Sequence, residues 1–180
     1  WVRSPCFLQL NTYRELVKIG FKVTMICEDN ISYYRKSQCG WSEHPDLQGV
    51  NLIVLRRKSW RKQAREILLN SRESIHIFGS LLPHKPFKVA YARRIALKMK
   101  MKIGILTEPS RNDKKSLLFK FFRDVQLKAL RTYVKKQIAC KVGFVLAVSS
   151  SNDRFFRWIG LPEEKLFPFG YFPKQQVSYA

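Results

Sequence analysis

The sequence is short of acidic residues. Asp and Glu together number 13 against 34 Lys and Arg, so the 180-residue chain carries a formal net charge of +21. A domain this basic usually meets something anionic, which means nucleic acid, an anionic membrane surface or a phosphorylated ligand. The charge balance therefore narrows the classes of partner before any motif is considered.

Long apolar runs and paired cysteines are also missing. No apolar run reaches the roughly 18 residues that a membrane-spanning helix needs, and no secretory signal is visible. The four cysteines are scattered, with no C-x-x-C pair and no histidine at metal-ligand spacing. We therefore expect no metal site and mostly buried, free thiols in a reducing compartment. These cysteines are Cys6, Cys27, Cys39 and Cys140.

Short apolar segments alternate with amphipathic ones along the whole chain, and the apolar share of 46% is enough for one core. This alternation predicts a mostly parallel sheet with helices on both faces, a Rossmann-like three-layer α/β sandwich. We expect strands at 21–29, 49–57, 74–80, 101–110, 142–150 and 165–169, and helices at 6–18, 59–70, 86–100, 113–137 and 152–159. The first helix has no strand ahead of it, so we expect the first strand to precede Trp1.

Sheets of this kind bind ligands beyond the carboxyl ends of their strands, near the point where the strand order reverses. Polar residues follow several of the expected strands. Those residues are Glu28, Asp29, Gly79, Ser80, Thr107, Glu108, Ser110, Ser149, Ser150 and Ser151. We expect any functional site to be built from them.

Two titratable residues near this edge are candidates for chemistry. Glu108 stands between a strand end and Pro109, where a carboxylate can accept a hydrogen bond from a hydroxyl or take its proton. The alternative is a helix-capping or salt-bridged glutamate beside Arg111. His84 lies in a loop after a strand and can contact phosphate or sugar, or serve only as a loop residue. His76 lies inside an apolar strand and is expected to be a core histidine.

Small residues at the strand ends allow two interpretations. Gly79 and Ser80 can let a ligand approach the backbone, or can simply form a turn. The serines from Ser149 to Ser151 can cap the next helix or help its N-terminus to meet an anion. No G-x-S-x-G motif and no suitable histidine–aspartate partners accompany them, so we expect no serine nucleophile.

Residues 111–141 contain ten Lys or Arg and two acids, interleaved with Phe and Leu. Such a segment predicts contact with an anionic membrane, worth about 1 kcal/mol per basic residue near the surface. The alternative is an ordinary solvated helix face. The residues expected at the membrane are Lys114, Lys115, Phe119, Lys120, Phe122, Arg123, Lys128 and Arg131.

Three stretches resemble a known family. They are "YRELVKIGFKVTMIC" (13–27), "SIHIFGSLLPHKPFKVAYARRIALKMKMKIGILTEPS" (74–110) and "LAVSSSNDRFFRWIGLPEEKLFPFGYF" (146–172). Together they resemble the N-terminal domain of GT-B glycosyltransferases of the group 1 class (family 4), and the last stretch is the most specific. The sequence departs from the family in two places: residues 3–6 lack the glycines common before the first helix, and Glu108 stands where a histidine is frequent.

The resemblance implies that residues 1–180 are a single acceptor-binding domain, inactive alone, whose donor-binding partner domain is absent. It implies no cofactor in this domain and a nucleotide-sugar donor for the full-length enzyme. The acceptor would be a glycan or lipid-linked sugar of cell-surface biosynthesis in a bacterium. The expected location is cytoplasmic, peripheral at the inner face of the plasma membrane. Residues expected to bind the acceptor are Gly79, Ser80, His84, Thr107, Ser149 and Ser150.

Two other functions stay open. The charge permits a nucleic-acid-binding α/β module, although no recognition helix, RNA-binding motif or zinc finger is present and the aromatic residues lie on apolar faces. Nucleic acid is therefore not the expected partner. A stand-alone sugar-binding domain is the other alternative.

Overall fold

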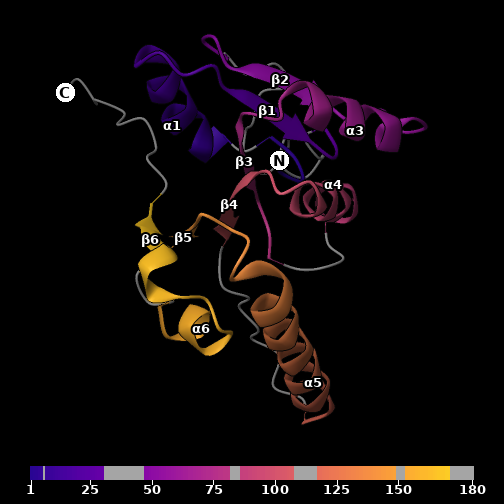
Figure 1. Cartoon of the computed structure of the whole chain (residues 1–180), viewed down its shortest axis with the longest axis vertical. Coiled ribbons are helices and arrows are strands. Elements are labelled where there is room, and N and C mark those ends of the chain that lie inside the picture. The colour runs from indigo at the N-terminus through magenta and orange to yellow at the C-terminus, as the bar shows by residue number, and fades with distance from the viewer. Residues whose placement is uncertain (6, 31–46, 82–85, 108–116, 149–152, 171–180) are drawn as a thin grey trace, which may run out of the picture.

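A computed structural model describes residues 1–5, 7–30, 47–81, 86–107, 117–148 and 153–170. Helices and strands alternate along the chain, as the sequence predicts (Figure 1). The helices are α1 (Phe7–Lys18), α3 (Trp60–Asn70), α4 (Phe87–Lys98), α5 (Leu117–Tyr133) and α6 (Asp153–Trp158). The strands are β1 (Thr24–Cys27), β2 (Asn51–Val54), β3 (Ile75–Phe78), β4 (Lys102–Thr107), β5 (Phe144–Val148) and β6 (Leu166–Phe169).

All strand pairs are parallel. β1 pairs with β2, and β3, β4, β5 and β6 follow one another in a four-stranded sheet. Sequential parallel strands need crossover helices, and the helices α4, α5 and α6 supply them. The predicted α/β class with a mostly parallel sheet is therefore confirmed. β6 is an edge strand and accommodates Pro168, which has no N–H to donate.

The first three residues join the two sheets. On one side, the Val2 N–H donates to Ile26 O at 2.9 Å, and the Glu28 N–H donates to Val2 O at 3.0 Å. On the other side, the Trp1 amine donates to Ile77 O and the Gly79 N–H donates to Trp1 O, both at 2.7 Å. Trp1 to Arg3 thus lie in the sheet between β1 and β3, where the expected first strand belongs. That further residues of this strand precede Trp1 stays a prediction.

Each face of the sheet has its own core. α1 packs through Leu10 against one face, where it meets Met25 and Cys27 of β1. The neighbouring Ile26 points to the opposite face, because successive side chains of a strand alternate. That second face is covered by α3, α4, α5 and α6, whose buried residues form the larger core. Helices therefore lie on both faces, as predicted.

Local sequence explains several boundaries. Gly20 has a positive φ of 96° and ends α1, a conformation that costs glycine little. Ser59 precedes α3 as expected, but its side chain makes no capping hydrogen bond. α5 continues as a π-helical turn, Val134–Ile138, which the sequence pattern does not reveal. A 3-10 turn, Glu163–Lys165, leads into β6.

Candidate functional site

The carboxyl ends of the strands gather the polar residues expected there. Glu28 and Asp29 follow β1, Gly79 and Ser80 follow β3, and the buried Thr107 ends β4. Because β3 and β4 are parallel neighbours and Trp1–Arg3 links β3 to β1, these ends share one edge of the sheet. The strand order also reverses there. The chain leaves Arg3 for α1 on one face, and leaves β3 for α4 on the other.

Gly79 has a packing reason to be glycine. A Cβ atom there would lie 3.1 Å from Val2 Cγ1 and 3.2 Å from the Trp1 carbonyl oxygen. Both distances are tighter than ordinary contacts, so the missing side chain lets Trp1–Arg3 pass close to β3. This close approach of two backbones differs from both the turn and the ligand roles considered for Gly79.

Arg93 fixes the backbone at Ser80. Its side chain is completely buried in α4, and its guanidinium donates a hydrogen bond to the Ser80 carbonyl oxygen. Burial lowers the pKa of Arg93, while its interaction with the Tyr133 side chain on α5 acts in the opposite direction. This role is not predictable from the sequence, because one arginine among many on a basic helix stands out by no pattern.

Lys88 joins the end of β1 to the start of α4. Its Nζ atom donates to the Glu28 carbonyl oxygen at 2.7 Å and lies 3.6 Å from Asp29 Oδ1. The Lys88 backbone N–H donates to Glu28 Oε2 at 3.1 Å, which places a carboxylate at the N-terminus of α4. One cation and two carboxylates therefore meet at this edge of the sheet. Sequence reasoning noted the acids but missed Lys88.

His76 is a core histidine, as expected. The Trp1 Nε1–H donates to His76 Nδ1 at 3.3 Å, so His76 Nε2 carries the proton and donates to the Ser71 carbonyl oxygen at 3.0 Å. Burial lowers the pKa of His76, partly offset by the bond to Ser71. Both ring nitrogens are occupied by structural partners, which leaves the ring no role as a ligand.

Several predicted site residues cannot be placed. Glu108, His84, Ser149 and Ser150 lie outside the described residues, and so do Lys114 and Lys115. Phe119, Lys120, Phe122 and Arg123 lie on α5, but the placement of their side chains is not described. Their roles stay predictions.

Two of the residues expected at the membrane are exposed on α5. They are Lys128 and Arg131, and the Arg131 guanidinium carbon lies 5.5 Å from the centroid of the Trp158 ring on α6. Val125, one turn before Lys128, has 52% of its surface exposed. Among the helices described, none has the length and apolar character to cross a bilayer.

The described cysteines are both free thiols, but only one is buried. Cys27 lies in the core against α1, and Cys140 is exposed after the π-helical turn. Burial raises the pKa of the Cys27 thiol to about 12. The described ranges contain no group of three or more His, Cys, Asp or Glu side chains that could hold a metal ion.

Comparison with protein families, curated proteins and solved structures gives no match for this chain.

Proposed function

We propose that the chain is the acceptor-binding domain of a GT-B glycosyltransferase of the group 1 class. The full enzyme would transfer a sugar from a nucleotide-sugar donor to a lipid-linked or polysaccharide acceptor. One observation carries the proposal: the parallel sheet reverses its strand order between Trp1–Arg3 and β3. The stretches that resemble the family supply strand ends on both sides of this point.

The reversal supports ligand binding at this edge. Where successive connections leave a parallel sheet toward opposite faces, the strand ends separate and a ligand can enter between them. In this chain the segment after Arg3 leads to α1 and the segment after Ser80 leads to α4. An acceptor bound there would contact the backbone near Ser80, which Arg93 holds in place.

The polar groups at this edge suit the hydroxyl groups of a sugar. Asp29 is 58% exposed on its side chain, and a carboxylate accepts hydrogen bonds from vicinal hydroxyls. The Lys88 ammonium lies 3.6 Å from that carboxylate and helps to hold it in place for such contacts. Glu108, directly after β4, would act as a hydroxyl acceptor or general base.

The proposal assigns donor binding to a second domain outside this chain. Nucleotide-sugar phosphates and the paired glutamates of the family would belong to that domain. The resemblance to the family supports this division of labour. It also supports retention of configuration at the anomeric carbon.

The proposed location is the cytoplasmic face of the plasma membrane. Lys128, Arg131 and the exposed Val125 on α5, with Trp158 on α6, combine basic and apolar groups on neighbouring elements. Such a combination favours the headgroup region of an anionic bilayer. A lipid-linked acceptor would then be reached without leaving the membrane surface.

Acceptor binding can be tested on the chain itself. Amide chemical shifts of the isotope-labelled chain would be followed by NMR during titration with a short-chain polyprenyl diphosphate sugar. We expect the largest shifts at Asp29, Ser80 and Thr107, and small shifts at the opposite strand ends, represented by Lys102. An Asp29→Asn variant should bind more weakly. Shifts confined to other surfaces, or none at saturation, would reject the acceptor site.

Transfer can be tested in the full-length protein. Membranes containing that protein would be supplied with radiolabelled nucleotide sugars, and label in the lipid and polysaccharide fractions would be counted. Glu108→Gln should lower transfer by about 10²-fold or more if Glu108 is the base. Undiminished transfer would remove Glu108 from the mechanism and leave the acceptor site standing. If the full-length protein transfers no sugar from any donor, the proposal that it is a glycosyltransferase is refuted.

A further inference from the structure

A basic surface precedes and includes α3, outside every site considered above. Six cations and one acid, Glu66, lie within eleven consecutive residues. All six cationic side chains are exposed. We call this set the α3 basic surface, and its members are Arg56, Arg57, Lys58, Arg61, Lys62 and Arg65.

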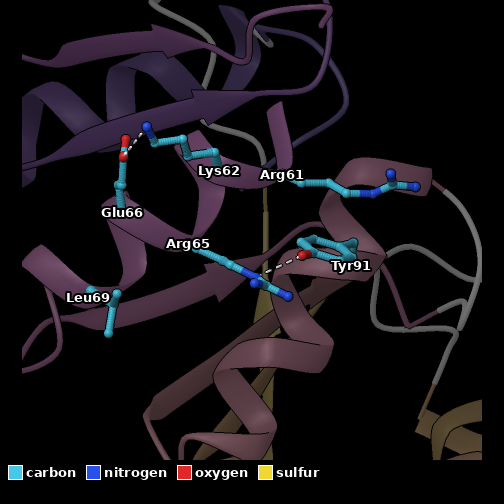
Figure 2. Close-up of a pocket in the computed structure, with 6 residues that line it drawn as sticks. All are labelled: Arg61, Lys62, Arg65, Glu66, Leu69 and Tyr91. Atoms are coloured by element: carbon cyan, nitrogen blue, oxygen red, sulfur yellow. Dashed lines mark hydrogen bonds and ion pairs between the residues drawn. The ribbon is translucent and has the colours of Figure 1, made fainter. Parts of the chain in front are cut away.

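The surface borders an open groove of about 290 Å³ between α3 and α4 (Figure 2). Arg61, Lys62, Arg65 and Glu66 line it, together with Leu69 and Tyr91, and its walls are mostly carbon. In Figure 2 the Arg65 side chain reaches the Tyr91 hydroxyl, the Arg61 side chain extends past the Tyr91 ring, and Leu69 lies at the other end of the group of side chains drawn. The groove thus has an apolar floor and a cationic rim.

Internal contacts hold the groove in shape. Arg65 Nε donates to the Tyr91 hydroxyl at 3.0 Å, which ties α3 to α4. The Trp60 ring meets the Tyr91 ring edge-on at a centroid distance of 4.9 Å, and the Arg61 guanidinium carbon lies 5.0 Å from the Trp60 ring centroid. The Arg56 N–H donates to Gln63 Oε1 at 2.8 Å, so the loop before α3 is held against the helix.

Little within the described chain neutralises this charge. Glu66 lies 3.9 Å from Lys62, but both side chains are more than half exposed, so this ion pair is weak. The positive charge of the other five residues is therefore mostly available to an anionic partner.

Exposed apolar side chains identify the kind of partner. Leu69 in the groove and Phe87, which packs against Trp60, each have 58% of their surface exposed. A polynucleotide gains from cations and aromatic rings but little from an exposed leucine. A bilayer accepts all three, because apolar groups enter the interface while cations attract the headgroups.

We propose that the α3 basic surface docks the protein on an anionic phospholipid membrane, with lipid phosphates at the rim of the α3–α4 groove and Leu69 and Phe87 in the interface. This surface is separate from the segment 111–141 to which the sequence pattern assigned membrane contact. The proposal does not depend on sugar transfer, and it holds for a sugar-binding or other peripheral protein equally.

The test is sedimentation of the chain with vesicles. Phosphatidylcholine vesicles with and without phosphatidylglycerol would be compared at physiological salt. The variant Arg61→Gln/Lys62→Gln/Arg65→Gln is expected to bind the anionic vesicles about tenfold or more weakly. The matched control Lys22→Gln/Lys100→Gln/Lys102→Gln removes three exposed cations near the amino ends of β1 and β4, outside the segment 111–141, and should bind within about threefold of the parent chain. Circular dichroism would verify that both variants fold.

A second variant separates a membrane from a nucleic acid. Leu69→Ser should weaken binding to anionic vesicles and leave any binding to duplex RNA unchanged. Equal losses in the groove and control variants would overturn the proposal, since net charge alone would then govern binding. So would RNA binding that is tighter than vesicle binding and insensitive to Leu69→Ser, or the absence of vesicle binding in the parent chain.

Discussion

Cys27 and Cys140 show how burial sets the chemistry of two identical side chains. The thiolate is the reactive form, and burial raises the pKa of the Cys27 thiol to about 12. In a Cys6→Ser/Cys39→Ser/Cys140→Ser variant we expect Cys27 to react with a thiol reagent only after denaturant is added. The companion variant that keeps Cys140 and replaces the other three should react within the mixing time. Rapid native labelling of Cys27 would contradict its position in the core.

His76 makes stability depend on mildly acidic pH. Burial lowers its pKa, so the folded chain keeps the ring neutral while the unfolded chain binds a proton below about pH 6.5. The unfolded state then holds more protons, so stability is lost as the pH falls below about 6.5, by at most about 1.4 kcal/mol per pH unit from this residue. Urea unfolding of the parent chain and His76→Gln should show a flatter pH dependence in the variant. Parallel plots of unfolding free energy against pH would contradict this role of His76, because the two chains share all other titrating groups.

Gly104 lies under an aromatic ring. A Cβ atom on this β4 residue would be 2.3 Å from Phe144 Cζ on the neighbouring β5, so the ring would have to move. Gly104→Ala should lower the free energy of unfolding by about 1–3 kcal/mol, and Phe144→Leu should relieve part of this loss. Gly143→Ala is the control, since its Cβ would meet Ile103 O at an ordinary 3.6 Å. Equal costs for the two alanines would show that the ring is not the cause.

At the scale of elements, Arg93 connects three of them. It belongs to α4, donates to the backbone after β3 and interacts with Tyr133 on α5. Arg93→Met would remove the donor and leave the Ser80 carbonyl without this bond, at a cost of about 2–4 kcal/mol. Tyr133→Phe should cost about 1 kcal/mol. Denaturant unfolding of both variants and the double variant forms a cycle, and strictly additive costs would mean that the two side chains are not coupled.

The succession of helices and strands is readable from the sequence, because apolar segments alternate with amphipathic ones and glycines such as Gly20, Gly79 and Gly160 follow several of them. The placement of Trp1–Arg3 was not readable. Three residues show no period, and their partners Ile26 and Ile77 lie far along the chain. The π-helical turn after Tyr133 was hidden for a similar reason, since its residues suit any helix.

The candidate site, too, was predictable from the sequence only in part. Strand ends located Glu28, Asp29, Gly79 and Ser80, because parallel topology fixes which edge they share. Lys88 escaped notice, since its contacts to β1 bring together residues 60 positions apart. The α3 basic surface was not among the sequence-based candidates, and it is the structure that places it beside Tyr91 of α4.

At the scale of the whole molecule, the charge of +21 must repel itself. Raising the salt concentration from about 0.01 M to about 0.15 M shortens the Debye length from about 30 Å to about 8 Å. We therefore expect the free energy of unfolding to increase over this range. The ion pairs lost to screening are mostly between exposed side chains, such as Lys18–Glu15, and contribute little. Urea titrations with sodium chloride would show this, and a decrease in stability would contradict it.

Trp1–Arg3 also constrain the order in which the sheet can fold during synthesis. On the ribosome this central segment of the sheet emerges before both of its neighbours, yet its bonds reach Ile26 on one side and Ile77 on the other. Its apolar Trp1 side chain, which stacks on Phe78, must wait until β3 has been translated. Until then the nascent chain exposes an unfinished sheet edge, which is the state most open to chaperones and to mispairing.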